Sequence, residues 1–246
     1  MNPLESSPAN GAASTVAIDR LEPAAILDSI DRRGFALSVP VVSDGECEAL
    51  AALYDDGAVF RSTVTMSRHG FGRGEYKYFA YPLPPLVGAL RRRVYEQLAP
   101  VANEWSTRLG GPADWPVGHG ELAARCSAAG QLRPTPLLLR YGVGDFNCLH
   151  QDLYGAIHFP LQAILLLDRP GIDFDGGELV LVEQRPRRQS TPIVVPLVRG
   201  AIAIVPVKER PVASERGFSR IQIRHGVSAL RRGLRRTLGL IFHDAA

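Results

Sequence analysis

The tripeptide His150-Gln151-Asp152 and the later apolar segment Ile221–His225 carry the strongest structural signal in this 246-residue chain. Residues two apart in an extended segment project to the same side, so His150 and Asp152 would present an imidazole and a carboxylate to one point. His225 supplies a second imidazole from a distant strand. Two imidazoles and one carboxylate on one face of a metal leave the opposite face open, which suits Fe(II) that must also bind oxygen and a co-substrate.

A candidate anion site follows His225 in the sequence. Ten residues further on, Arg235 and Thr237 lie two apart in a segment that alternates as a strand does. They share one face, whereas Arg236 shares the other with Leu238. A guanidinium can donate two parallel, charge-assisted hydrogen bonds to a carboxylate, so the pair predicts a carboxylate site at Arg235. A shift of one residue in register would select Arg236 instead.

The second half of the chain has the pattern of a β-barrel. Short apolar or alternating runs are separated there by Gly, Pro and Asp, which are typical of turns. The predicted strands are Leu137–Tyr141, Gln162–Leu167, Glu178–Val182, Thr191–Leu197, Ala201–Pro206, Ile221–His225 and Arg235–Phe242.

The first half has a helical pattern with a few strands. Helices are predicted at residues 21–33, at Pro84–Leu109, at Glu121–Ala129 and after the capping box Ser43–Glu46, and strands at Phe35–Val39 and Phe60–Met66. A helical front half followed by short strands predicts a mostly β fold with supporting helices: a double-stranded β-helix, that is, a cupin-like jelly roll.

The predicted organisation is one continuous domain with an irregular N-terminus. Residues 1–20 are rich in Ser, Ala, Asn and Pro and are predicted to be disordered. Residues 21–136 form the supporting region, and residues 137–246 form the jelly-roll core. Three widely spaced cysteines indicate reduced thiols. The absence of a long apolar run and of a signal-peptide pattern predicts a cytoplasmic protein without a membrane partner.

The charge of the chain does not favour nucleic acid as a partner. The formal net charge is only +3, carried by 28 basic and 25 acidic residues. A net charge this small does not by itself indicate a polyanionic binding partner. Nucleic acid is therefore an unlikely partner from composition.

Between Leu137 and Asp244 the sequence resembles the 2-oxoglutarate and Fe(II)-dependent dioxygenases, specifically their prolyl-4-hydroxylase-like branch. Within that branch it is most similar to bacterial oxygenases of unassigned substrate. The matching segments, in the family's order, are Leu139–Asp145, His150–Asp152, Asp175–Leu179, Gly200–Ile204, His225 and Gly233–Thr237, with Phe242–Ala245 at the end.

The resemblance implies a role for each motif residue. His150, Asp152 and His225 would bind Fe(II). Arg235, with Thr237, would bind the distal carboxylate of the co-substrate 2-oxoglutarate, and Tyr141 would donate a hydrogen bond to it. Molecular oxygen is the second co-substrate, and ascorbate is a candidate reductant. Related halogenases lack the carboxylate ligand, so Asp152 implies hydroxylation, or a demethylation that proceeds through it.

Three functions are compatible with these motifs. The first is hydroxylation of a peptidyl, amino-acid or small-metabolite substrate. The second is a nucleobase demethylase, although the pattern of two Arg further beyond the distal His that is usual in that branch is absent here. The third is a non-catalytic jelly-roll module for binding or sensing, in which His150 and Asp152 would occupy an ordinary turn and His225 would be a core histidine.

Several other polar or aromatic residues could contribute to the site. The helical front half and the loop His69–Gly74, with Tyr76, Tyr78 and Phe79, are expected to form one wall of the entrance. Asn147 and Gln162 are close enough in sequence to contact the co-substrate or substrate. His158 and His243 have no assigned role.

Overall fold

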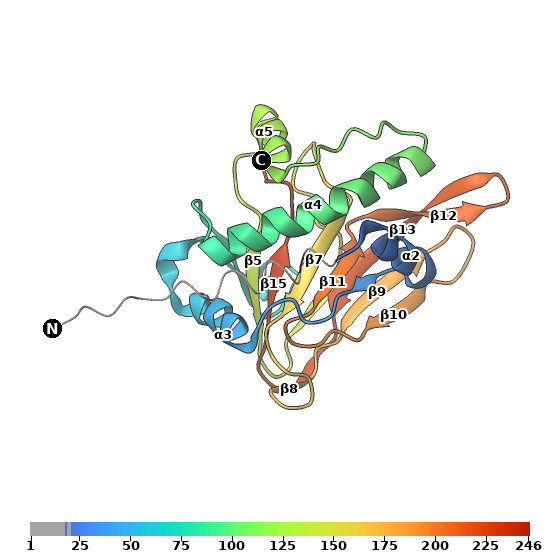
Figure 1. Cartoon of the computed structure of the whole chain (residues 1–246). Coiled ribbons are helices and arrows are strands. Elements are labelled where there is room, and N and C mark those ends of the chain that lie inside the picture. Colours follow the sequence, from blue (N-terminus) through green and yellow to red (C-terminus); the bar gives the residue numbers. More distant parts are fainter. Residues whose placement is uncertain (1–17, 19–20) are drawn as a thin grey trace.

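The computed structural model describes residue 18 and residues 21–246. Of the N-terminal segment 1–20 that was predicted to be disordered, every residue except Ile18 lies outside this part of the chain. Ile18 itself is buried in the core. Figure 1 shows a β-sheet assembly with helices on one side.

The helices begin and end close to the positions that the sequence predicts. They are α2 (Pro23–Arg33), α3 (Asp44–Ala52), α4 (Pro85–Arg108) and α5 (His119–Ala128), with short 3-10 turns at Leu53–Asp55, Gly57–Val59 and Met66–Arg68. The predicted capping box is present, because Ser43 Oγ accepts from the Glu46 amide and the Glu46 carboxylate accepts from the Ser43 amide. This exchange satisfies two backbone donors at the start of α3.

The strands form two antiparallel sheets and a small ribbon. The seven-stranded sheet has the order β1 (Ala36–Leu37), β11 (Ile202–Pro206), β7 (Leu161–Leu166), β15 (Arg235–Leu240), β5 (Leu137–Tyr141), β4 (Glu75–Phe79) and β2 (Phe60–Thr65). The six-stranded sheet contains β10 (Thr191–Val195), β9 (Leu179–Gln184), β13 (Gly217–Val227), β6 (Phe146–His150) and β3 (Gly72–Arg73), with β12 (Glu209–Ser214) beside β13. Strands β8 (Phe174–Gly176) and β14 (Leu230–Gly233) make the ribbon.

This arrangement confirms the predicted mostly β jelly-roll fold. Strands β1, β2 and β4 belong to the front half of the chain, yet they complete the same sheet as β5 and β15 from the second half. We therefore propose that residues 21–246 fold as one domain. The sequence did not predict β3, β4, β6, β8, β12 or β14, because these strands are short or carry polar residues without clear alternation.

The seven-stranded sheet separates two hydrophobic layers. Ala163 and Leu165 of β7 pack toward the helices, with Val94 of α4 in the same cluster. Leu166, on the opposite face of β7, packs between the two sheets with Ile223 of β13. Figure 1 shows α4 lying across the sheet at β5, β15 and β7. The alternation along each strand therefore leaves one face of the sheet for the interior of the barrel.

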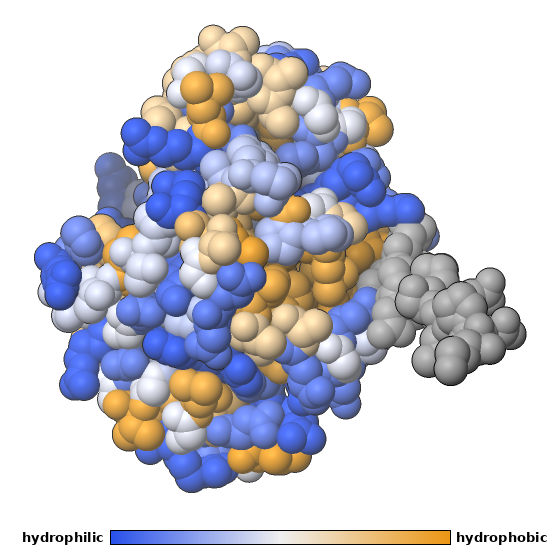
Figure 2. All heavy atoms as spheres, turned by 90° about the vertical axis from the view of Figure 1, so that its left-hand side faces the viewer, coloured by the Kyte–Doolittle hydropathy of each residue, from blue (hydrophilic) through white to orange (hydrophobic). Residues whose placement is uncertain are grey.

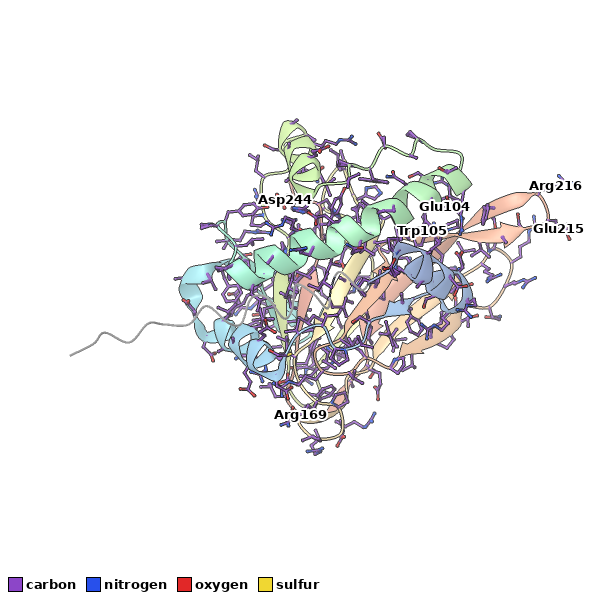
Figure 3. The ribbon with its side chains drawn as sticks, viewed as in Figure 1. Glu104, Trp105, Arg169, Glu215, Arg216 and Asp244 are labelled. Carbon is purple, nitrogen blue, oxygen red and sulfur yellow. The ribbon has the colours of Figure 1, made fainter. Side chains whose placement is uncertain are left out.

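The C-terminal segment is fixed to α4 by a buried ion pair. Arg91 of α4 donates to Asp244 Oδ1 at 2.7 Å and also to the carbonyl oxygens of Ile241 and Phe242. Figure 3 shows Asp244 beside α4, and Glu215 and Arg216 at the far tip of the β12–β13 hairpin. The motif Phe242–Ala245 therefore has a structural role in closing the fold.

The outer surface is mixed in polarity. On the face shown in Figure 2, apolar side chains gather near the middle and hydrophilic ones surround them. Among the residues that the structure describes, no helix is both long and apolar enough to cross a membrane.

Candidate metal and co-substrate site

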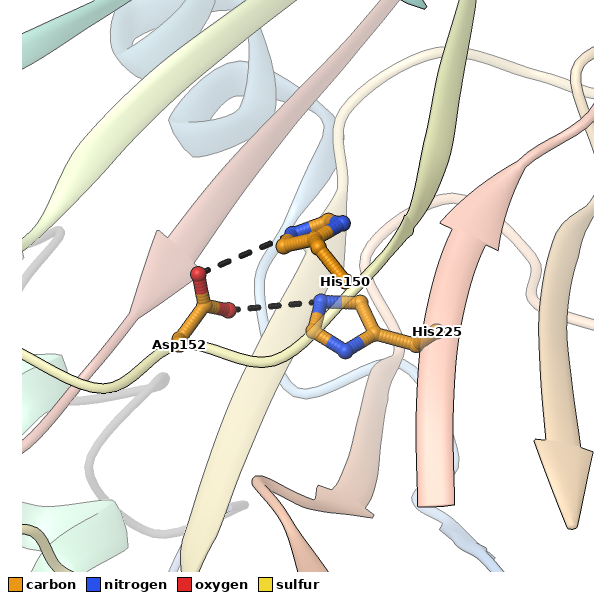
Figure 4. Close-up of side chains that lie close together, drawn as sticks. All are labelled: His150, Asp152 and His225. Atoms are coloured by element: carbon orange, nitrogen blue, oxygen red, sulfur yellow. Dashed lines mark ion pairs between the residues drawn. The ribbon is translucent and has the colours of Figure 1, made fainter. Parts of the chain in front are cut away.

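Three of the predicted site residues meet inside the barrel. His150 is the last residue of β6, Asp152 lies in the loop that follows, and His225 lies on β13 directly opposite His150 in the antiparallel pair. One potential ligand atom from each residue lies within 4.8 Å of the other two. The Nε2 atoms of His150 and His225 are 3.6 and 3.3 Å from Asp152 Oδ1 and Oδ2, respectively (Figure 4).

The backbone around this group holds both histidines in place. His150 Nδ1 lies 2.8 Å from the carbonyl oxygen of Cys148, which can only accept, so the ring donates from Nδ1 and leaves Nε2 free as a ligand. A side chain on Gly226 would bring a Cβ within 2.6 Å of the carbonyl oxygen of Asn147. Glycine after His225 therefore allows β13 and β6 to approach closely enough for the two rings to lie 4.2 Å apart.

The electrostatics of the group favour an anionic Asp152 carboxylate and a neutral His150 imidazole. Burial alone would raise the pKa of Asp152, but hydrogen bonding and charge from His225, the charge of His150 and the hydroxyl of Tyr154 hold it well below its usual range. Burial, followed by the charge of His225, lowers the pKa of His150. Neutral imidazole and ionised carboxylate are the forms that bind a metal cation.

A second predicted group lies beside the first, on β15 and β5. Arg235 and Tyr141 are direct partners in the antiparallel pair, and Thr237 follows two residues along the same face. All three are buried and line one pocket of about 330 Å³ together with His150, Asp152 and His225. The structure therefore brings together all six residues that the sequence singled out.

Arg235 lies in this pocket without an anionic partner. Its side chain is 2% exposed, and within residues 21–246 it forms no ion pair and its Nη1 has no hydrogen-bond acceptor. Its guanidinium carbon lies 5.6 Å from the centre of the Tyr141 ring. Burial lowers its pKa. Because an unpaired buried charge costs several kcal/mol, such a site favours a bound anion.

The neighbouring Arg236 is directed away from the pocket. It forms a two-point ion pair with Asp168, with Nη2–Oδ1 at 2.6 Å and Nε–Oδ2 at 3.2 Å. Leu238 and Leu240, on the same face, pack into the core beneath the helices. The strand register that places Arg235 rather than Arg236 in the barrel is the one that the alternation of apolar residues predicted.

The paired glycines before β9 make room for Arg235. Gly177 has φ +63°, and a Cβ there would lie 2.9 Å from Arg235 Cδ and 2.8 Å from Leu230 Cδ1. The sequence indicated only a turn at Gly176–Gly177. The contact between this turn and the aliphatic part of the Arg235 side chain depends on the tertiary fold.

Substituting Gly177 is expected to disturb the anion site. Gly177→Ala should displace Arg235 and so raise the concentration of 2-oxoglutarate needed for half-maximal binding. It should also lower the free energy of unfolding by about 1–2 kcal/mol, because alanine is strained in the left-handed backbone conformation. Gly171→Ala is the matched control, because Gly171 has φ +78° and a Cβ added there would have no other atom within 4 Å. Calorimetric titration of 2-oxoglutarate checks both variants, and equal affinities would contradict this role.

The other candidates divide into site residues and core residues. Gln162 approaches the His225 ring at 3.1 Å, and Asn147 donates to the Tyr141 hydroxyl at 3.4 Å. His243 is fully buried, its Nδ1 accepts from the Phe159 amide, and burial lowers its pKa to about 3. His158 lines a separate cavity beside Trp105.

The expected aromatic wall is present with two corrections, the first being that no residue of helices α2, α3, α4 or α5 lines the pocket. Phe71 and Gly70 from the loop, and Tyr76 and Tyr78 from β4, line the pocket. Phe79 does not, because it is fully buried on the opposite face of β4 and packs against Phe60 with ring centres 4.7 Å apart. Successive residues of a strand face opposite sides, so Tyr78 and Phe79 cannot share one wall.

Tyr154 is a pocket residue that the sequence analysis missed. Its hydroxyl donates to Asp152 Oδ1 at 2.8 Å. The signal was available in the sequence, because the step of two residues that links His150 with Asp152 continues to Tyr154.

Comparison with known proteins relates this architecture to oxygenases. Residues 74–245 match the model of the Oxygenase-NA family, described as "Oxygenase, catalysing oxidative methylation of damaged DNA". Two uncharacterized proteins from strains of Mycobacterium tuberculosis are each 46% identical over 168 residues, which cover 68% of this chain and 72% of theirs.

Solved structures show the same fold at low identity. A prolyl-4-hydroxylase from Pseudomonas putida superposes with a TM-score of 0.55 at 15% identity, covering 91% of this chain and all of that one. A 2OG-Fe(II) oxygenase family protein from Burkholderia pseudomallei has a TM-score of 0.55 at 16% identity, covering 91% and 93% of the two chains. A prolyl hydroxylase from Trichoplax adhaerens, solved with a peptide fragment, has a TM-score of 0.51 at 14% identity, covering 96% and 94%.

Proposed function

Because the chain belongs to the Oxygenase-NA family, we propose that His150, Asp152 and His225 bind Fe(II), and that the protein uses it with 2-oxoglutarate and oxygen to hydroxylate an organic substrate. The observation that carries this proposal is the convergence of the three ligands with a buried, unpaired Arg235 in one pocket.

The donor set fits Fe(II). Two imidazoles and one carboxylate on one face are the ligands found in non-haem Fe(II) oxygenases. The ligand atoms lie within 4.8 Å of one another, and all three residues line the same pocket of about 330 Å³. Fe(II) bound there would take three ligands from the protein, and the rest of the pocket would be open to the co-substrate and oxygen.

The surroundings of Arg235 fit the co-substrate. Its free Nη1 can donate to the distal carboxylate of 2-oxoglutarate, and the buried hydroxyls of Thr237 and Tyr141 lie on the same wall. Burial raises the pKa of Tyr141 to about 12, so its phenol stays protonated as a donor. Each of these groups favours a dicarboxylate that spans from Arg235 to the three ligands.

The reaction assigns separate tasks to these residues. Bound Fe(II) and 2-oxoglutarate supply the oxidising chemistry, in which the co-substrate loses carbon dioxide and becomes succinate. Arg235 and Thr237 orient the co-substrate, and the apolar walls exclude water from the reacting groups. Asp152 occupies the ligand position that halogenases leave open, which supports hydroxylation.

The remaining walls of the pocket favour an apolar or ring-bearing group of the substrate. Tyr76, Val227 and Ile164 line the interior, and Phe71 and Leu149, which are 47% and 44% exposed, lie at the rim. Once Arg235 holds the co-substrate, no other Arg or Lys lines this pocket among the described residues. We therefore propose a peptidyl or amino-acid side chain, or a small metabolite, with a neutral reacting group.

A methylated nucleobase is the second candidate substrate. The description of the family, which names damaged DNA, favours it. A neutral planar base that has left its stack could lie against the faces of Tyr76 and Phe71, as bases do in enzymes that modify them. The formal charge of +3 gives this alternative little electrostatic support.

Succinate production tests the proposal and separates the two substrates. Protein loaded with Fe(II) under argon is mixed with oxygen, 2-oxoglutarate and either a peptide and amino-acid library or N-methylated single-stranded DNA. The true substrate should stimulate succinate formation. Mass spectrometry should show that it gains an oxygen atom if it is a peptide or amino acid, or loses a methyl group if it is methylated DNA. Absence of Fe(II)-dependent succinate under every condition would contradict the proposed activity.

Removing the aromatic side chains that line the pocket should uncouple the reaction. Phe71→Ala and Tyr76→Leu are expected to impair oxidation of the substrate while sparing slow decarboxylation of 2-oxoglutarate without it, because they alter the wall and not the ligands. Phe218→Ala, a similarly exposed ring on the β12–β13 hairpin, is the control. Parallel assays of succinate and oxidised substrate decide this, and equal loss of both products would place the two aromatics in a structural role.

A further inference from the structure

The carboxylate of Asp152 is held from two sides. Tyr154 donates its hydroxyl hydrogen to Oδ1 at 2.8 Å, and this direction is required because an ionised carboxylate can only accept. Oδ2 lies 3.3 Å from His225 Nε2. The two oxygens therefore have different surroundings, and Oδ1 is the one already engaged by a phenol.

The hydroxyl of Tyr154 is itself oriented by a second phenol. Tyr78 of β4 donates to the Tyr154 oxygen at 3.0 Å. The Tyr78 ring is almost completely buried, and the guanidinium of Arg61 lies 4.5 Å from its centre. Arg61 is fixed in turn by a 3.0 Å hydrogen bond to the carbonyl oxygen of Pro134. A chain of hydrogen bonds thus runs from the seven-stranded sheet to Asp152.

We propose that Tyr154, supported by Tyr78, is a positioning residue that keeps Asp152 bound to the metal through Oδ2 alone. This inference rests on the proposed function. Fe(II) in such sites has six coordination positions, three of which the protein fills. A keto acid that binds through two oxygens, together with molecular oxygen, needs the other three. If both oxygens of Asp152 bound the metal, one of these positions would be lost.

The chemistry of Tyr154 supports positioning rather than packing alone. Its ring contacts Tyr78 and His243 at 6.2 and 6.1 Å between centres, and a phenylalanine would keep both contacts. Only the hydroxyl reaches Asp152. A hydrogen bond to a charged group contributes about 1.5–3 kcal/mol, which is enough to select one orientation of a carboxylate.

A series of Tyr→Phe variants tests this role. Each purified, metal-free protein is titrated with Fe(II) under argon, then with 2-oxoglutarate while the visible charge-transfer absorption of the complex is recorded. Tyr154→Phe should weaken Fe(II) binding by roughly 10–100-fold, as loss of an outer partner of a ligand does, and should shift the absorption band. Tyr78→Phe should have a smaller effect in the same direction.

Tyr81→Phe is the matched control. Tyr81 also donates its hydroxyl to a carboxylate, Asp244 Oδ2, at 2.8 Å, but neither residue lines the pocket. The same atom is removed and the same kind of bond is lost, so any general effect on stability appears here as well. Fe(II) affinity and the absorption band of this variant should equal those of the wild type.

The outcomes separate this inference from the proposed function. If the wild type binds no Fe(II), the proposed function fails. If the wild type binds Fe(II) and Tyr154→Phe binds it with unchanged affinity and spectrum, the positioning role is wrong. If Tyr154→Phe does not fold, Tyr78→Phe decides, and wild-type values for that variant would overturn the role.

Discussion

Replacing any one of His150, Asp152 or His225 by alanine is expected to abolish Fe(II)-dependent turnover and to leave a folded domain. The three ligand atoms lie within 4.8 Å of one another, so each substitution removes one of the three ligands of the same metal site. Even outer partners of a metal ligand contribute 10–100-fold in affinity, so loss of a ligand should weaken Fe(II) binding by more than about 100-fold. Anaerobic titration with Fe(II), alongside circular dichroism, measures both properties.

His158→Ala is the control for this experiment. His158 follows Asp152 by six residues but lies in a separate cavity, so its loss should leave Fe(II) affinity unchanged. Stoichiometric, unweakened Fe(II) binding by the Asp152→Ala and His225→Ala proteins would show that the metal is held elsewhere.

Replacing Arg235 by alanine is expected to weaken binding of 2-oxoglutarate, with the second-largest effect of the substitutions considered. Truncating one partner of a buried, hydrogen-bonded charge pair costs on the order of 2–5 kcal/mol, which corresponds to a loss of affinity of roughly 30-fold to several thousand-fold. Fe(II) binding should persist, because Arg235 is not among the ligand atoms. Calorimetric titration of the anaerobic Fe(II) protein with 2-oxoglutarate gives the ratio of the dissociation constants of variant and wild type directly.

Arg236→Ala separates a specific anchor from a general need for arginine on β15. Arg236 pairs with buried Asp168 outside the barrel, so its loss should lower the free energy of unfolding and leave the affinity for 2-oxoglutarate within about threefold. Equal loss of affinity in the two variants would mean that the assumed role of Arg235 is wrong.

Local patterns in the sequence were sufficient to predict most helices and many strands, and to predict which residues of a strand share one face. The capping box at Ser43–Glu46, the helical stripe of α4 and the alternation in β15 each depend on interactions over a few residues. The same local alternation distinguished Arg235 from Arg236. Side-chain direction along a strand reverses at each residue, so the assignment needed only the register of apolar positions.

Contacts between distant segments required the tertiary structure. The placement of Phe79 in the pocket wall was wrong because its side is set by the pairing of β4 with β2 and β5, not by its aromatic character. The role of Gly177 also depends on a residue far along the chain, Arg235, whose stem occupies the space of the missing Cβ.

The sequence by itself predicted the fold class from its pattern of helices, short strands and turns. It predicted the three candidate ligands and the candidate carboxylate anchor from the spacings His150–Asp152 and Arg235–Thr237, together with the family resemblance that the ordered motifs carry. Only the tertiary structure decided that these groups share one pocket, that Arg235 has no anionic partner among the described residues, and that hydrogen bonds link Tyr78 through Tyr154 to Asp152. The physical reason is that burial and hydrogen-bond geometry arise from strand pairings between residues far apart in the chain, which no local pattern specifies.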